Sequence, residues 1–148
     1  MDCCLTEYTS CSPEDTADWG EKFGRTLKGG SVIALYGALG AGKTCLVKGI
    51  ARALGITENI TSPTYTIINE YRCNNNRITL YHIDAYRLSG DDDFNSTGAG
   101  ECIGGEGITI IEWSERLPRS IPPDAITIHI TITGPQSRVF RINEPARH

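Results

Sequence analysis

The segment that most constrains the fold is residues 31–54, in which an apolar run is followed by a glycine-rich turn and a second apolar segment. Residues 37–44 read Gly-Ala-Leu-Gly-Ala-Gly-Lys-Thr and match the pattern G-x-x-x-x-G-K-[ST]. The preceding run, Val-Ile-Ala-Leu-Tyr, is typical of a buried strand, and the following segment is typical of a helix. In this context the pattern predicts a phosphate-binding loop, or P-loop.

The P-loop has the composition needed to surround a polyphosphate. Small residues allow successive backbone N–H groups to point inward, and Gly37, Gly40 and Gly42 permit positive φ and close backbone approach. The helix that follows adds unbonded N–H groups and the positive end of its dipole. We therefore expect the whole loop to bind the nucleotide: Gly37, Ala38, Leu39, Gly40, Ala41, Gly42, Lys43 and Thr44.

Length and charge limit the classes of protein that fit. A chain of 148 residues has the size of one domain, typically about 100 to 150 residues. We expect a single P-loop ATPase domain over residues 1–148, ordered over about 5–142, with a tail at 143–148. The net charge of -4 argues against direct binding of DNA or RNA, because binding to a phosphate backbone usually requires a basic excess. If RNA is involved, a partner is expected to hold it.

The sequence shows no export or membrane signal. No apolar run reaches the length of about 18 residues that a membrane helix needs, and the N-terminus lacks the basic-then-apolar order of a signal peptide. A cytoplasmic protein is therefore expected. The six cysteines include no C-x-x-C pair and no metal-type spacing. We interpret them as reduced thiols, with a disulfide framework or a zinc site as the alternative.

The order of the predicted elements indicates an α/β fold. An edge strand is expected at residues 5–9, followed by a helix that Ser12 caps and that ends at the glycines 29–30. Residues 64–73 and 77–88 are expected to form an antiparallel hairpin around a turn of asparagines, which departs from a simple β-α-β alternation. We therefore predict a three-layer, P-loop NTPase-like fold with a mixed parallel and antiparallel central sheet.

The second half of the chain alternates between loops and strands. Residues 89–107 are polar and rich in glycine, and they predict a mobile loop with at most one helical turn. Residues 108–113 predict a buried strand that ends in an acid and an aromatic residue. Residues 125–133 predict a half-exposed strand, onto which residues 137–142 pair back.

Two acidic residues follow apolar strands, and a P-loop needs such acids for catalysis. Glu112 follows the more hydrophobic run, so we assign it, with Thr44, to Mg²⁺. Asp84 is assigned to orienting or deprotonating a water molecule, with Lys43 on the outer phosphates as the second catalytic residue. The roles of the two acids could be exchanged. Without a role in the site, Asp84 would cap a helix or pair with Arg87, and Glu112 would be a surface carboxylate.

Three further residues admit two interpretations each. His82 shares a strand face with Asp84 by period-two alternation, but histidines of this kind are more often core residues, and we do not count it as catalytic. Trp113 could stack in the site or pack in the core. Thr64 lies in a hydroxyl-rich loop that could sense the γ-phosphate or merely cap the loop entrance. We include Thr64 among the nucleotide-binding residues.

Missing motifs narrow the class of nucleotide-binding protein. The sequence has no N-K-x-D and, after the P-loop, no D-x-x-G, so a GTPase is not indicated and adenine is favoured. A small-molecule kinase is the enzyme alternative, but such kinases need an arginine-bearing lid, and residues 89–107 contain no arginine or lysine. A nucleotide-gated binding module with incidental hydrolysis is the third possibility.

Four segments in this order resemble one known family. They are residues 37–44, Ser-Pro-Thr-Tyr-Thr at 62–66, His-Ile-Asp-Ala-Tyr-Arg-Leu at 82–88 and Ile-Glu-Trp at 111–113. Together they are similar to the bacterial TsaE (YjeE) family over about residues 5–140. The resemblance implies a small cytoplasmic ATPase with a mixed sheet that uses ATP and Mg²⁺ in tRNA threonylcarbamoyladenosine biosynthesis.

The resemblance also implies partners and residue roles. TsaD-like and TsaB-like proteins would activate the ATPase and transfer threonylcarbamoyl to adenosine 37 of tRNA, and tRNA would be reached only through that complex. Lys43 would contact phosphates, Thr44 and Glu112 would bind Mg²⁺, Asp84 would support hydrolysis, and residues 62–66 would act as a switch.

The chain departs from the family pattern at two places. Ala38 stands where the family usually has an acid, which removes a local charge but leaves the backbone that faces the phosphates. In the family the segment at residues 89–107 is usually richer in glutamate and leucine, whereas here it is dominated by Asp, Asn and Gly. A partner contact through that segment is therefore in question.

Overall fold

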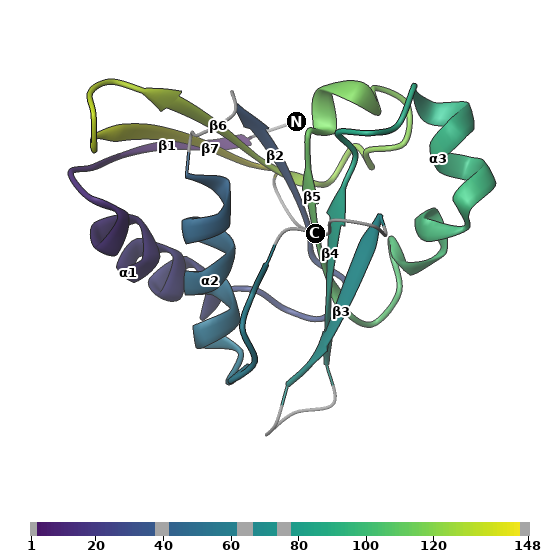
Figure 1. Ribbon diagram of the computed structural model, residues 1–148, viewed down its shortest axis with the longest axis horizontal. Helices are drawn as coiled ribbons and strands as arrows, with labels where there is room; N and C mark the ends of the chain where they lie inside the picture. Colours follow the sequence, from purple (N-terminus) through teal and green to yellow (C-terminus); the bar gives the residue numbers. More distant parts are fainter. Residues whose placement is uncertain (1–2, 38–41, 62–66, 74–77, 146–148) are drawn as a thin grey trace.

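The computed structural model describes residues 3–37, 42–61, 67–73 and 78–145 (Figure 1). The predictions for Ala38, Leu39, Gly40, Ala41 and Thr64, and for the turn of asparagines, lie outside these residues. The described strands form one seven-stranded sheet in the order β1-β7-β6-β2-β5-β4-β3. Their bounds are β1 Cys3–Ser10, β2 Val32–Gly37, β3 Ile68–Arg72, β4 Thr79–Asp84, β5 Ile108–Glu112, β6 Ile126–Ile132 and β7 Arg138–Pro145.

The sheet is mixed, as the sequence predicts. β2 runs parallel to both β5 and β6, and β4 runs parallel to β5. The pairs β1 with β7, β6 with β7 and β3 with β4 are antiparallel. The expected hairpin is thus the pair β3–β4, and the expected N-terminal edge strand is β1. β7 extends to Pro145, past the expected end at Ile142, because its last residues pair with the start of β1.

Helices cover both faces of the sheet and make three layers, which confirms the predicted fold class. Figure 1 shows α1 (Pro13–Gly24) and α2 (Lys43–Ala53) beside one face and α3 (Asp91–Thr97) beside the other. Alternate strand residues divide the core accordingly. Ile33 and Leu35 of β2 belong to the cluster beneath α2, with Leu46 and Ile50. Ile83 and Ile111 belong to the second cluster, together with Phe94 of α3. Other members of this cluster include Val32, Leu88, Trp113 and Leu117.

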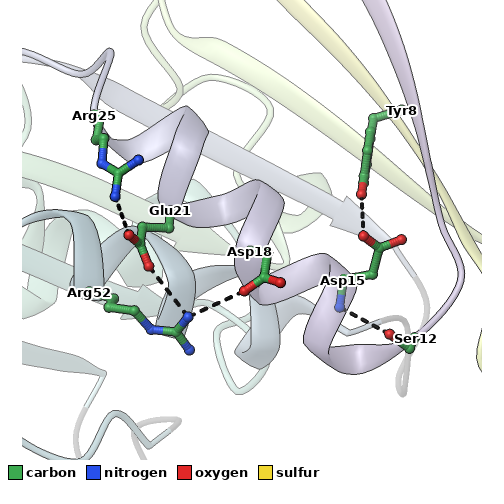
Figure 2. Close-up of polar contacts among 7 residues, drawn as sticks. All are labelled: Tyr8, Ser12, Asp15, Asp18, Glu21, Arg25 and Arg52. Atoms are coloured by element: carbon green, nitrogen blue, oxygen red, sulfur yellow. Dashed lines mark hydrogen bonds and ion pairs between the residues drawn. The ribbon is translucent and has the colours of Figure 1, made fainter.

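The first helix begins where the sequence predicts and ends earlier. The Ser12 hydroxyl accepts a hydrogen bond from the backbone N–H of Asp15 at 3.0 Å, which is an N-cap (Figure 2). The Asp15 carboxylate in turn accepts from the Tyr8 hydroxyl at 2.7 Å. α1 ends at Gly24 and not at the glycines 29–30, because i→i−3 hydrogen bonds from the N–H groups of Thr26 and Leu27 replace the helical pattern there. The Thr26 hydroxyl also donates to the Phe23 carbonyl.

Close approach of two backbones joins α1 to α2. A Cβ added at Gly49 of α2 would lie 2.1 Å from the carbonyl oxygen of Ala17, and one added at Gly20 would lie 2.8 Å from that of Leu46. Beyond this contact Arg52 of α2 reaches α1, where it pairs with Asp18 and Glu21 at 3.5 and 3.4 Å, as drawn in Figure 2. The two helices therefore form one tightly packed layer over β2.

The segment 89–107 differs from its prediction as a mobile loop. It contains the helix α3 and a 3-10 turn, η1 (Ala99–Cys102). Although the segment is mostly polar, Phe94 attaches it to the core: this side chain is 1% exposed and packs in the second core cluster. Asp91 also accepts hydrogen bonds from the Ser120 hydroxyl and the Arg119 N–H. No helix within the described residues is long and apolar enough to cross a membrane.

Candidate nucleotide-binding site

Three neighbouring parallel strands end at the same edge of the sheet. In the order β2, β5, β4, these strands end at Gly37, Glu112 and Asp84. Ligands of open α/β sheets bind outside the carboxyl ends of such strands. β2 leads directly into the P-loop, and Gly42, with φ of 95°, is the N-cap of α2. The sequence-predicted acids are thus brought to the P-loop by strand order alone.

Lys43, the first residue of α2, is buried in this site. It is 5% exposed, and its ammonium nitrogen donates to the Gly37 carbonyl at 2.9 Å. The same nitrogen lies 3.9 Å from the centroid of the Trp113 ring. Burial lowers the pKa of Lys43, and the charges of Glu112, and then of Glu115 and Asp84, oppose that shift. The cation is therefore held within a cluster of negative charge.

Asp84 and Glu112 are direct neighbours across two strands. They are paired positions in the parallel register of β4 and β5, and on a pleated sheet such partners point to the same face. Glu112 is 4% exposed. Burial raises the pKa of Asp84, and the Glu112 charge adds to the increase, whereas the N–H of Tyr86, bonded to the carboxylate at 3.0 Å, opposes it. Neither acid is therefore a free surface carboxylate.

His82 is a site residue that the sequence analysis left out. It is fully buried, and its Nε2 is hydrogen-bonded to Oε2 of Glu112. The signal was present, since alternation along β4 places His82 on the same face as Asp84. The register of β4 and β5 places Glu112 on this face too, but the sequence carries no signal for the contact between the two side chains.

Trp113 packs against the second core cluster and also contacts Lys43. It adopts a left-handed backbone conformation with φ of 60°, which turns the chain out of β5 into η2 (Ser114–Arg116). One contact of its ring is the Lys43 ammonium. Another is Tyr86, whose ring centroid is 4.8 Å away, and the Arg116 guanidinium lies over Tyr86 at 5.3 Å. These four side chains form a continuous series of contacts from the P-loop helix to the surface.

The oxygen ligands of the site fit a magnesium ion that is bound partly by the protein and partly by a phosphate. Thr44 is the second residue of α2, partly exposed beside Lys43, and Asp84 and Glu112 add carboxylate oxygens. The described residues contain no group of three or more His, Cys, Asp or Glu that could hold a metal by itself. Mg²⁺ is characteristically bound by one or two carboxylates plus substrate phosphates, so this sparse oxygen set suits it.

None of the cysteine side chains that the structure describes has a recorded contact with Lys43, Asp84 or Glu112. The four whose side chains are described, Cys11, Cys45, Cys73 and Cys102, are free thiols. Burial raises the pKa of Cys73 and Cys102, so neither has the low pKa of a reactive cysteine. These side chains carry no catalytic assignment.

Comparison with known proteins identifies the family. The family model described as "Threonylcarbamoyl adenosine biosynthesis protein TsaE" matches residues 10–140. A tRNA threonylcarbamoyladenosine biosynthesis protein TsaE from Treponema pallidum (strain Nichols) is 49% identical over 133 residues, which covers 90% of this chain and 96% of the relative. The protein of the same name from Nostoc sp. is 44% identical over 141 residues, with coverage of 93% and 85%.

A solved structure is similar in fold as well as in sequence. The crystal structure of Bacillus subtilis YdiB superposes with a TM-score of 0.80 at 31% identity, covering 99% of this chain and 89% of that chain. The matched family region contains Lys43, Asp84 and Glu112. With the family model and these relatives in agreement, the chain belongs to the TsaE family of threonylcarbamoyl adenosine biosynthesis proteins.

Proposed function

We propose that this protein is a Mg²⁺-dependent ATPase that serves tRNA threonylcarbamoyladenosine formation and that TsaD-like and TsaB-like partners activate it in the cytoplasm. One observation carries the proposal. The buried ammonium of Lys43 begins the helix after the P-loop, and the carboxylates of Asp84 and Glu112 end the two strands beside it. A cation and two acids arranged around a P-loop are the groups that typically catalyse phosphoryl transfer to water.

Each residue of this cluster has a proposed role. Lys43 neutralises charge on the outer phosphates, while the first N–H groups of α2 bind phosphate oxygens. Thr44 and Glu112 would hold Mg²⁺, which supplies further neutralisation of the phosphates. Asp84 orients the attacking water and accepts its proton; its raised pKa makes it a better proton acceptor than an ordinary exposed aspartate. When ATP binds, the Lys43 ammonium gives up its hydrogen bond to the Gly37 carbonyl and donates to a phosphate oxygen instead.

The link to tRNA is proposed to be indirect. The relatives are named as tRNA threonylcarbamoyladenosine biosynthesis proteins, yet this chain has a net charge of -4. A protein that binds RNA without a partner is normally basic. Partners that hold the tRNA would explain both facts, with ATP hydrolysis here driving a step of their cycle.

The small-molecule kinase is the less favoured alternative. Kinases of this kind close a lid that carries arginines over the phosphates. The elements α3 and η1, which would supply such a lid, contain no arginine or lysine.

The deciding experiment is an ATPase assay of the wild-type chain and of Lys43→Ala. Each is measured alone, with TsaD-like and TsaB-like proteins, and with those proteins plus tRNA. We expect slow hydrolysis alone and a strong increase with partners in the wild type only. Rapid, partner-independent phosphoryl transfer to a metabolite would support the kinase, and unchanged hydrolysis with and without partners would refute activation.

A further inference from the structure

The histidine beneath the site has one described polar contact, and that contact is with a proposed metal ligand. His82 is 0% exposed, in the middle of β4. Its neighbours on the same face of β4 and β5 are the apolar Leu80, Ile108 and Ile110, all of which belong to the core beneath α2. Within this apolar layer, Nε2 of His82 meets Oε2 of Glu112.

The second ring nitrogen indicates which atom carries the proton. Nδ1 of His82 is buried and has no hydrogen-bond partner among the described residues. A proton on Nδ1 would leave a buried donor unsatisfied and would turn the bare lone pair of Nε2 toward a carboxylate. With the proton on Nε2, the imidazole donates to Glu112, and only an acceptor is left unpaired, which is the less costly arrangement.

His82 thus engages Oε2 of Glu112, and within the described part of the chain no hydrogen bond to Oε1 is seen. A glutamate side chain loses considerable rotamer freedom when it binds an ion, and a hydrogen bond from a rigid ring removes much of that freedom in advance. The Lys43 ammonium does not serve this purpose, because its described contacts are the Gly37 carbonyl and the Trp113 ring.

We propose that His82 is a positioning residue: its Nε2–H holds Oε2 of Glu112 so that Oε1 is presented to Mg²⁺ in the nucleotide complex. The inference rests on the proposed function, since it presumes that Glu112 binds the ion. Partners that orient metal-binding side chains typically contribute about 10- to 100-fold to metal affinity. His82 acts through Glu112 and touches neither substrate nor ion.

Two substitutions of similar length separate this role from a packing role. In His82→Gln the amide nitrogen falls near the place of Nε2 and can still donate to Glu112. In His82→Met the side chain fills similar space and has no donor. Binding of ADP is measured by calorimetry without Mg²⁺ and across a Mg²⁺ titration, and thermal unfolding of each variant is recorded.

We expect His82→Met to weaken the apparent affinity of the ADP complex for Mg²⁺ about 10- to 100-fold, with ADP affinity in the absence of Mg²⁺ unchanged. His82→Gln should restore most of the loss. If Met cannot be accommodated, His82→Asn replaces it, because the Asn amide matches the position of Nδ1 and cannot reach Glu112. In a Glu112→Gln background, loss of the histidine donor should cause little further loss.

Four results would overturn the inference. Wild-type Mg²⁺ affinity in His82→Met, or an equal loss in the Met and Gln variants, would reduce His82 to a packing residue while the proposed function stands. Additive losses in the Glu112→Gln background would show that His82 does not act through Glu112. Wild-type protein that binds no ADP with or without Mg²⁺ would refute the proposed function itself, and the positioning role with it.

Discussion

The ammonium nitrogen of Lys43 lies 3.9 Å from the centroid of the Trp113 ring and donates to the Gly37 carbonyl at 2.9 Å. A cation over a tryptophan face is stabilised by the ring quadrupole, and the effect grows when the pair is shielded from water. Under the proposed function, Lys43 would exchange these partners for a phosphate. Trp113 in turn touches Tyr86, which is 50% exposed, so this exchange would take place next to a surface side chain.

Trp113 should report nucleotide binding through its fluorescence. The chain has two tryptophans, and Trp19→Phe leaves Trp113 as the remaining one while keeping an aromatic ring in the stack with Tyr8 and Phe140. We expect Mg-ATP to change the emission of this variant, because the cation leaves the indole face. Trp113→Phe is the matched control and should show no comparable change. Unaltered Trp113 emission at saturating nucleotide, with binding verified by calorimetry, would contradict the exchange.

Lys43→Ala should lose most nucleotide binding. Hydrogen bonds to charged groups contribute about 1.5–3 kcal/mol each, so the affinity for Mg-ATP should fall about 10- to 150-fold. Lys48→Ala on the same helix is the control, since Lys48 is exposed and its loss should leave the affinity unchanged. Calorimetry with Mg-ATP measures both, and equal affinities for the two variants would rule out the role of Lys43.

Asp84→Asn should separate binding from hydrolysis. The amide has the shape of the carboxylate but cannot accept a proton, and general-base catalysis typically contributes about 100- to 10,000-fold in rate. We expect hydrolysis in the presence of partners to fall by that factor while ADP still binds. The same variant tests the binding-module hypothesis: if threonylcarbamoyladenosine still forms at the normal rate when hydrolysis has stopped, hydrolysis is incidental.

Gly49→Ala should destabilise the fold although it adds a better helix former. Alanine gains about 1 kcal/mol over glycine in an open helix, but here its Cβ would lie 2.1 Å from the Ala17 carbonyl oxygen and 3.0 Å from the Glu21 nitrogen. Overpacking of this kind costs about 1–3 kcal/mol. Urea denaturation should show a lower free energy of unfolding than for the wild type and Lys48→Ala. A variant as stable as the wild type would mean that α1 and α2 can separate without cost.

The contact between Tyr8 and Asp15 predicts a loss of stability at high pH. Burial, followed by the hydrogen bond to Asp15, raises the pKa of Tyr8 from 10.0 to about 12. Because the unfolded chain releases this proton first, the stability due to Tyr8 is complete below about pH 10 and is lost as the pH rises toward about 12. Tyr8→Phe should therefore show a shallower alkaline decrease in the free energy of unfolding, measured by urea denaturation. Tyr86→Phe, at an exposed position, should keep the wild-type slope, and parallel slopes for all three proteins would refute the assignment.

Much of the fold follows from local signals. The Ser12 cap predicts the first helix, and the P-loop between an apolar strand and α2 predicts the parallel centre of the sheet. The break in β-α-β order before the β3–β4 hairpin predicts the antiparallel edge. α3 was missed because a single phenylalanine, Phe94, anchors a helix whose other residues are polar. α1 ends before the predicted glycines because Thr26, an ordinary helix position by its pattern, bonds to the Phe23 carbonyl through both its N–H and its hydroxyl.

Part of the candidate site could likewise be predicted from the sequence, and part could not. Asp84 and Glu112 could be selected from the sequence because each acid ends an apolar run, and parallel strand ends meet at one edge. The hydrogen bond of His82 to Glu112 and the contact of Lys43 with Trp113 could not, because each depends on a side-chain orientation between elements far apart in the chain. A single sequence contains no local signal for such an orientation.

The pairing of β1 with β7 has a mechanical consequence. Cys3 lies opposite Pro145 and Ser10 opposite Arg138, so the two ends of the chain leave the same end of one edge ladder. A stretching force applied through those ends would load the ladder one hydrogen-bonded pair at a time, beginning at Cys3, instead of shearing all pairs together. The edge would open under a small pull, while the central strands that carry Asp84 and Glu112 would bear no tension until β1 had been removed.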